Sequence, residues 1–129
     1  MKRLLALLAI LVLAGCQTGT LETITSPAAV QGVITFVGAK AKPNMVNNQV
    51  ANVRKFKAEL AAALTGTFDS SVLIALINKY TGSFASQLQD AVAVAEGAFA
   101  AAEAKFGKHN PQVLAYAQAI VNGLTAAGF

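Results

Sequence analysis

Two rows of apolar residues, each repeating every seven positions, run between residues 85 and 106. One row is Ala85, Val92, Phe99 and Phe106, and the other is Leu88, Ala95 and Ala102. Seven residues make almost two turns of an α-helix, so both rows fall on one side of a helix, as the a and d positions of about three heptads. No segment of the chain shows the sustained alternation of a half-buried strand. The chain is therefore expected to bury helices against helices.

Proline and glycine divide the rest of the chain into further helical segments. Ser26-Pro27 places an N-cap residue before a proline at the first helical position, and Asn110-Pro111 repeats this pattern. The other expected breaks are Pro43, with Asn44 capping the next helix, then Gly66, Gly82-Ser83 and Gly107. We predict an all-α fold, a small antiparallel bundle of about five helices, joined by loops of about two to four residues.

Each predicted helix has one apolar face. Outside the heptad segment, the residues expected to be buried are Val30, Val33, Ile34 and Val37; Val46, Val50, Val53, Leu60 and Leu64, with Phe56 at the edge; Val72, Leu73, Leu76, Ile77 and Tyr80; and Val113, Leu114, Ala117, Ile120, Val121 and Leu124. The only cysteine is Cys16, so no intrachain disulfide can form. The stability of the domain must come from apolar burial.

The first sixteen residues have a different pattern. Lys2 and Arg3 give a positive start, and an unbroken apolar run extends from Leu4 to Leu13. A bilayer-spanning helix needs about 20 residues, so this run is too short to span. A charged start, a short apolar core and small residues before a cleavage point are typical of a secretory signal peptide.

The residues Leu13-Ala14-Gly15-Cys16 resemble a lipobox, the cleavage and acylation signal of bacterial lipoproteins. The resemblance implies cleavage between Gly15 and Cys16. It also implies a diacylglyceryl group on the Cys16 thiol and an N-acyl chain on the new amino terminus, with no other cofactor. Two or more acyl chains give stable membrane anchoring. In lipoprotein families an aspartate after the cysteine retains the protein at the inner membrane. Gln17 therefore implies the outer membrane, with the domain facing the periplasm.

The chain thus divides into a signal peptide (1–15), a lipidated cysteine with a flexible tether (16–26) and a helical domain (27–129). The tether is rich in threonine and lacks periodicity. Ten residues reach about 33 Å when extended and roughly 17 Å when relaxed. Two of the ten basic residues leave with the signal peptide, so eight remain against six acids. A nucleic-acid partner is not expected for this charge.

The sequence offers little for catalysis or metal binding. His109, the only histidine, is expected in an exposed loop, and the spacing of zinc ligands is absent. Glu96 and Glu103 lie on one polar helix face, which suggests a solvated surface rather than the buried acid of a glycosidase. We expect no metal site and no enzymatic activity.

Two groups of residues are candidates for binding. A basic cluster consists of Lys40, Lys42, Arg54, Lys55 and Lys57. It either contacts anionic headgroups at the membrane surface or forms a solvated face that balances the acids of a later helix. A stripe of small residues consists of Ala93, Gly97 and Ala101. It permits tight packing within the bundle or a surface for self-association.

The leading prediction is a non-catalytic, membrane-anchored envelope lipoprotein whose bundle contacts membrane lipid and another envelope protein. One alternative is a carrier of a small apolar ligand, because an alanine-rich bundle can leave space between its helices. Another is a phage or prophage envelope lipoprotein that acts in lysis or in superinfection exclusion.

Overall fold

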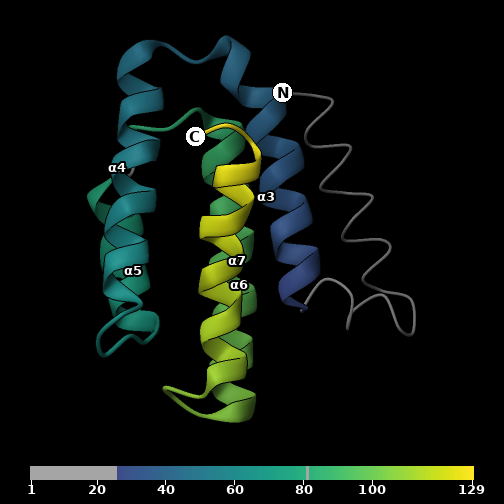
Figure 1. The fold of residues 1–129 in the computed structure, drawn as a ribbon, viewed down its shortest axis with the longest axis vertical. Coiled ribbons are helices and arrows are strands. Elements are labelled where there is room, and N and C mark those ends of the chain that lie inside the picture. The colour runs from purple at the N-terminus through teal and green to yellow at the C-terminus, as the bar shows by residue number, and fades with distance from the viewer. Residues whose placement is uncertain (1–25, 81) are drawn as a thin grey trace.

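The computed structural model describes residues 26–80 and 82–129 (Figure 1). These residues form five α-helices, one 3-10 turn and no strand. The elements are α3 (Pro27–Ala41), η1 (Lys42–Asn44), α4 (Asn47–Ala63), α5 (Ser70–Lys79), α6 (Ser86–Phe106) and α7 (Pro111–Ala126). The predicted all-α bundle is confirmed. The predicted signal peptide, the lipobox with Cys16 and most of the tether lie outside the described residues.

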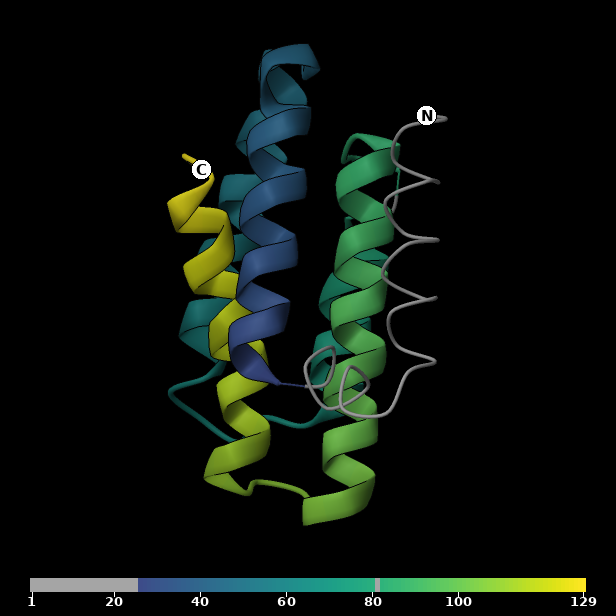
Figure 2. The ribbon, with the colours of Figure 1, turned by 90° about the vertical axis from the view of Figure 1, so that its right-hand side faces the viewer.

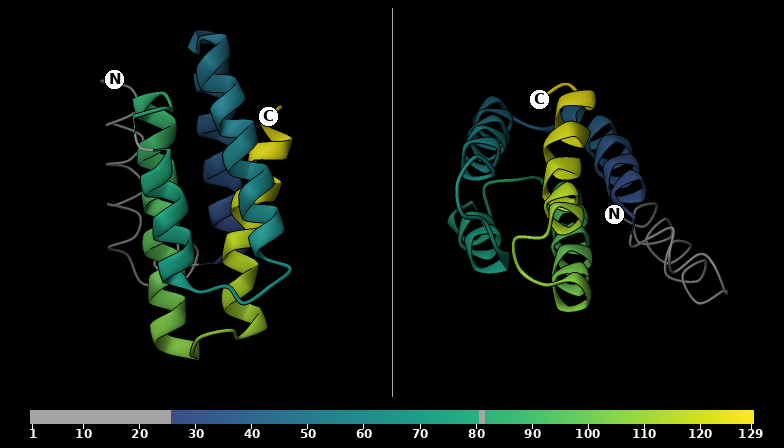
Figure 3. Two further views of the ribbon diagram at one scale, coloured as in Figure 1. Left: turned by 90° about the vertical axis from the view of Figure 1, so that its left-hand side faces the viewer. Right: turned by 60° about the horizontal axis from the view of Figure 1, so that its bottom comes forward.

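The helices form three layers, and successive helices run in opposite directions (Figure 1). Helices α6 and α7 make the middle layer. Helix α3 covers one side of this pair (Figure 2), and α4 and α5 cover the other (Figure 3). Helix α7 contacts α3, α4 and α6. Half of its sixteen residues are buried: Val113, Tyr116, Ala117, Ala119, Ile120, Val121, Gly123 and Leu124. This wide apolar face lets α7 pack against three helices, while Gln118 and Asn122 remain exposed on its other side.

Helices α3 and α7 pack closely at two glycines. A Cβ atom placed on Gly123 would lie 2.7 Å from Cβ of Ile34 on α3. A Cβ atom on Gly38 would lie 2.8 Å from Cβ of Ala127, which follows α7. Real Cβ atoms essentially never come this close, so both positions require glycine for the observed spacing of the helices.

The core contains an aromatic cluster in which the sequence pattern misplaced one residue, Phe56. Phe56, expected at the edge of its helix face, is fully buried. Its ring makes edge contacts with Tyr80 at 6.0 Å and with Phe84 at 5.4 Å between ring centres. A second edge contact joins Phe68 and Phe99 at 5.5 Å. The error arose because the side that α4 buries is set by the helices packed against it, α5 and α7, and the pattern within α4 does not show where these lie.

Two residues expected in the core are exposed instead. Val46 is 63% exposed because α4 begins only at Asn47, so Val46 precedes the first turn. Phe106 is 41% exposed because it is the last residue of α6. The periodic pattern continues to the last residue of a helix, whereas the neighbouring helices that bury its apolar face can end earlier.

The helix ends confirm most of the predicted signals. The hydroxyl of Ser26 accepts from the backbone N–H of Ala29, and the side-chain oxygen of Asn110 accepts from that of Gln112. Gly107 ends α6 with a φ of +92°, a left-handed conformation that glycine adopts without strain. Asn44 does not cap α4, because residues 42–44 form the 3-10 turn. The connections between α4 and α5 (64–69) and between α5 and α6 (80–85) are longer than expected.

Candidate functional site

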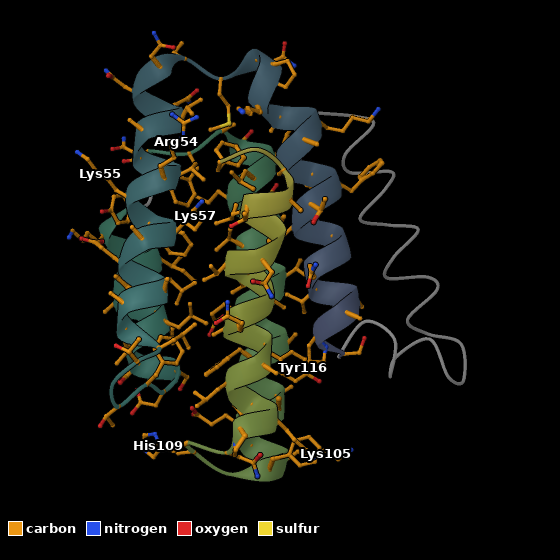
Figure 4. The ribbon with its side chains drawn as sticks, viewed as in Figure 1. Arg54, Lys55, Lys57, Lys105, His109 and Tyr116 are labelled. Carbon is orange, nitrogen blue, oxygen red and sulfur yellow. The ribbon has the colours of Figure 1, made fainter. Side chains whose placement is uncertain are left out.

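Two lysines of the predicted basic cluster form hydrogen bonds within the bundle. Lys42 Nζ donates to the backbone oxygen of Gly128 at 2.6 Å, and Lys57 Nζ donates to that of Phe129. Figure 4 shows Lys57 directed into the space between α4 and α7, whereas Lys55 points outward. The ring of Phe129 is buried, and the ammonium group of Lys42 lies 5.8 Å from its centre. These two lysines hold the segment after α7 against α3 and α4.

The other three residues of the basic cluster are exposed. Arg54 and Lys55 lie on α4, and Lys40 lies near the end of α3, with its ammonium group 5.6 Å from the ring centre of Phe36. Ser26, where the described chain starts, is at the opposite end of α3. Fifteen helical residues at 1.5 Å each separate the two ends by about 22 Å. Lys40 and Lys42 therefore lie at the end of α3 that is remote from Ser26, whereas Arg54, Lys55 and Lys57 lie near the middle of α4.

The small-residue stripe faces solvent. Ala93, Gly97 and Ala101 are all exposed, and a Cβ atom on Gly97 would meet no atom within 4 Å. The interpretation that this stripe packs tightly within the bundle is therefore wrong. Its residues lie on the side of α6 opposite the buried heptad seam, which contacts α3, α5 and α7. The close helix contact that we expected there is made at Gly38 and Gly123, which the sequence analysis did not single out.

Three carboxylates have structural partners. Glu103, expected on a solvated face, accepts from the backbone N–H of Ser70 at 2.9 Å and from its hydroxyl at 2.7 Å. Asp69 caps α5, and hydrogen bonds from the Ser71 side chain and the Val72 backbone lower the pKa of its carboxyl group. The third, Glu59, is part of a polar group between α4 and α5.

That polar group consists of Glu59, Lys79 and Tyr80. Lys79 Nζ and Glu59 Oε1 form an ion pair at 2.6 Å. The hydrogen bond from Lys79 lowers the pKa of the Glu59 carboxyl group, and burial raises the pKa of the Tyr80 hydroxyl group. The Lys79 and Glu59 side chains are 58% and 37% exposed, so water screens the pair. The arrangement joins two helices and lacks the enclosed setting that acid–base catalysis uses.

His109 lies in an exposed loop, as predicted. Its φ is +65°, and its Nδ1 lies 3.0 Å from the backbone oxygen of Phe68, so the ring connects the α6–α7 connection to the α4–α5 connection. Within residues 26–80 and 82–129, no three histidine, cysteine or acidic side chains come together as a group that could hold a metal ion.

A shallow hollow opens on the surface of α3. Its lining residues are Gln31, Gly32, Thr35, Phe36, Ala39, Lys40 and Ala126. The hollow is open to solvent, unlike the space between helices in which a carrier would enclose an apolar ligand. Phe36 is 46% exposed beside it.

The end of the bundle nearest the tether carries a group that the sequence analysis missed. We call it the α6–α7 loop, and it comprises Lys105, Phe106, Gly107, Lys108 and His109. Lys105 Nζ lies 5.3 Å from the ring centre of the exposed Phe106. Lys105 and Lys108 are both exposed. The signal that could have revealed this group is an aromatic residue at the last position of the heptad rows, followed directly by a helix stop.

The α6–α7 loop is held in a defined shape. The N–H of Gly107 donates to the backbone oxygen of Glu103 at 2.8 Å, and the side chain of Asn110 donates to that of Phe106 at 3.3 Å. With His109 held at Phe68, these bonds fix both sides of the loop. The loop thus presents two lysines and one aromatic ring from a fixed backbone.

Among the described residues, no helix combines the length and apolar character needed to cross a bilayer. Comparisons of the chain with protein-family models, with curated proteins and with solved structures found no match.

Proposed function

We propose that this chain is a lipid-anchored lipoprotein of the cell envelope, and that its helical bundle is a non-catalytic interaction module. The observation that carries the proposal is Leu13-Ala14-Gly15-Cys16, placed directly after a charged start and a short apolar run. Gln17 favours the outer membrane over the inner membrane, with the bundle in the periplasm. The partners are membrane lipid and a protein of the envelope.

The position of the first helix supports this assignment. Helix α3 begins at Pro27 with Ser26 as its cap, which leaves ten residues after Cys16. A chain of that length spans roughly 17 Å when relaxed. The bundle would be held within reach of the headgroups, as a module that acts at the membrane surface needs.

The uses of the acidic side chains support a non-catalytic role. Asp69 and Glu103 hold the start of α5, and Glu59 pairs with Lys79. A general acid in a glycosidase needs a raised pKa in an enclosed site, whereas the pKa values of Glu59 and Asp69 are lowered. An interaction role uses the exposed surface instead.

Acyl-chain labelling in cells, followed by intact mass of the purified protein, tests the anchor. We expect wild-type protein that begins at Cys16 and carries acyl chains. Cys16→Ser should lose the lipid and the lipoprotein-type cleavage. A Cys16→Ser protein that still carries acyl chains at its amino terminus, or an unlipidated wild-type protein, would refute the assignment.

The interaction role has a separate test. Cross-linking in cells from an exposed position, with the acylated protein in its membrane, should capture a specific envelope protein. If acylated protein captures no protein and its deletion leaves the envelope unchanged, the module has no partner of this kind and the proposal fails in that part.

A further inference from the structure

The two ends of the bundle lie at different distances from the point where the tether joins α3. The described chain starts at Ser26, in the half of the bundle that contains the α6–α7 loop (Figure 1). Figure 4 shows Lys105 and His109 at that end, and Arg54 and Lys55 toward the other. The sixteen residues of α7 separate the two ends by about 24 Å. A relaxed tether of roughly 17 Å is shorter than this separation, so a chain anchored at Cys16 brings the α6–α7 loop closer to the bilayer than the basic cluster.

The chemistry of the α6–α7 loop fits a lipid surface. Phe, like Trp and Leu, is typical of apolar surfaces buried at the boundary between headgroups and acyl chains, and lysines beside it attract anionic headgroups. Phe106 is one of the few large apolar side chains that the fold leaves exposed, and lysines lie on both sides of it. The acids at this end, Asp69 and Glu103, accept the hydrogen bonds that start α5, and Asp69 lies close enough to Lys108 for the lysine's charge to help lower its pKa.

We propose that the α6–α7 loop faces the bilayer, with Phe106 in the interfacial region and Lys105 and Lys108 against anionic lipid headgroups. This inference rests on the proposed lipid anchor. It assigns the membrane contact to the end of the bundle where α3 begins. The α6–α7 loop thus takes the role that the sequence analysis gave to the basic cluster. Arg54, Lys55 and Lys40 then lie further than the loop from the membrane that holds the anchor.

The rigidity of the loop supports this contact. Hydrogen bonds from Gly107 and Asn110 and the contact of His109 with Phe68 fix the loop before it meets lipid. A preorganised surface loses little conformational entropy on binding. The tether also keeps the local concentration of lipid high, so a small surface is sufficient for the contact.

The experiment uses the full acylated protein, inserted into vesicles of phosphatidylethanolamine and phosphatidylglycerol that contain spin-labelled headgroups. The lipid occupies the thiol of Cys16, so an introduced cysteine is the single reactive thiol. Two exposed positions at opposite ends, Ala104→Cys and Asn44→Cys, each receive the same fluorophore. We expect strong quenching at position 104 and weak quenching at position 44.

Charge reversal provides the matched comparison. Each lysine near an anionic surface changes the population of the docked state roughly fivefold. Lys105→Glu with Lys108→Glu should therefore reduce the quenching at position 104 to the level at position 44. Arg54→Glu with Lys55→Glu, near the middle of α4, should leave both signals unchanged. Phe106→Ser should also weaken the signal at position 104, with circular dichroism confirming that the helices are retained.

The outcomes separate the orientation from the anchor. Equal quenching at the two positions, or stronger quenching at position 44, in protein whose acyl chains are confirmed by intact mass would overturn the orientation and leave the anchor standing. Protein that lacks acyl chains would refute the anchor, and the inference would be refuted with it. A change in quenching on reversal of Arg54 and Lys55, but not of the loop lysines, would also overturn it.

Discussion

Replacing Gly123 by alanine tests the close approach of α3 and α7. The new Cβ atom would lie 2.7 Å from Cβ and 2.8 Å from Cγ2 of Ile34, and 2.9 Å from the backbone oxygen of Gln31. A Cβ atom and a backbone oxygen cannot turn away as the end of a flexible side chain can. The two helices must therefore separate or α7 must shift, and either change disturbs the packing of the buried Ile34.

The magnitude follows from two opposing terms. Overpacking costs typically 1–3 kcal/mol, and the immovable atoms place this site near the top, at about 3 kcal/mol. Alanine recovers roughly 1 kcal/mol of helix propensity relative to glycine. We expect a net loss of about 2 kcal/mol in the free energy of unfolding. For a domain of about 100 residues, this lowers the melting temperature by about 8–16 °C.

Gly97→Ala is the matched control, because position 97 is also inside a helix but has no atom within 4 Å of the new Cβ. Only the propensity term applies there, so we expect a gain of about 0.5–1 kcal/mol. Chemical denaturation of a soluble version that starts at Thr18, followed by circular dichroism, measures both variants. A Gly123→Ala protein as stable as the wild type would refute the close packing of α3 on α7, and a destabilised Gly97→Ala protein would refute the exposure of the stripe.

Three further perturbations test other parts of the structure. Phe56→Ala removes a fully buried ring that contacts Tyr80 and Phe84. We expect the free energy of unfolding, measured by thermal or chemical denaturation, to fall by about 3–5 kcal/mol. A fall below about 1 kcal/mol would contradict the central position of this ring. The carboxyl group of Asp69 has a lowered pKa in the folded state, so its contribution to stability is complete above the usual aspartate pKa and is lost as the pH falls through the folded-state value. Asp69→Asn should therefore flatten this acidic part of the curve of unfolding free energy against pH. An unchanged curve would argue that Asp69 does not cap α5. Lys57→Ala should speed amide hydrogen exchange at Gly128 and Phe129, because the Lys57 side chain holds that segment. Arg54→Ala is the control and should leave these exchange rates unchanged. Equal rates in the two variants would show that other contacts hold the segment.

The sequence by itself determined the helices and most of their ends. The caps at Ser26 and Asn110 and the stop at Gly107 depend on backbone groups within one turn, so nearby residues are sufficient to specify them. The heptad rows identified the buried side of α6 for the same reason, since residues three and four positions apart share a helix face. The seven-residue repeat could not show where the covering layer ends, and so it included Phe106.

Only the tertiary structure showed that residues of the same type, in similar sequence settings, have different roles. Gly97 and Gly123 are both glycines within helices, yet one faces solvent and the other contacts Ile34 across a helix crossing. Lys42 and Lys57 belong to one basic cluster in the sequence, but they bind backbone oxygens that lie 86 and 72 positions further along the chain. Local sequence cannot encode such pairs, because each depends on which helix lies opposite. The position of the α6–α7 loop at the tether end was decided in the same way, by the direction of α3 within the bundle.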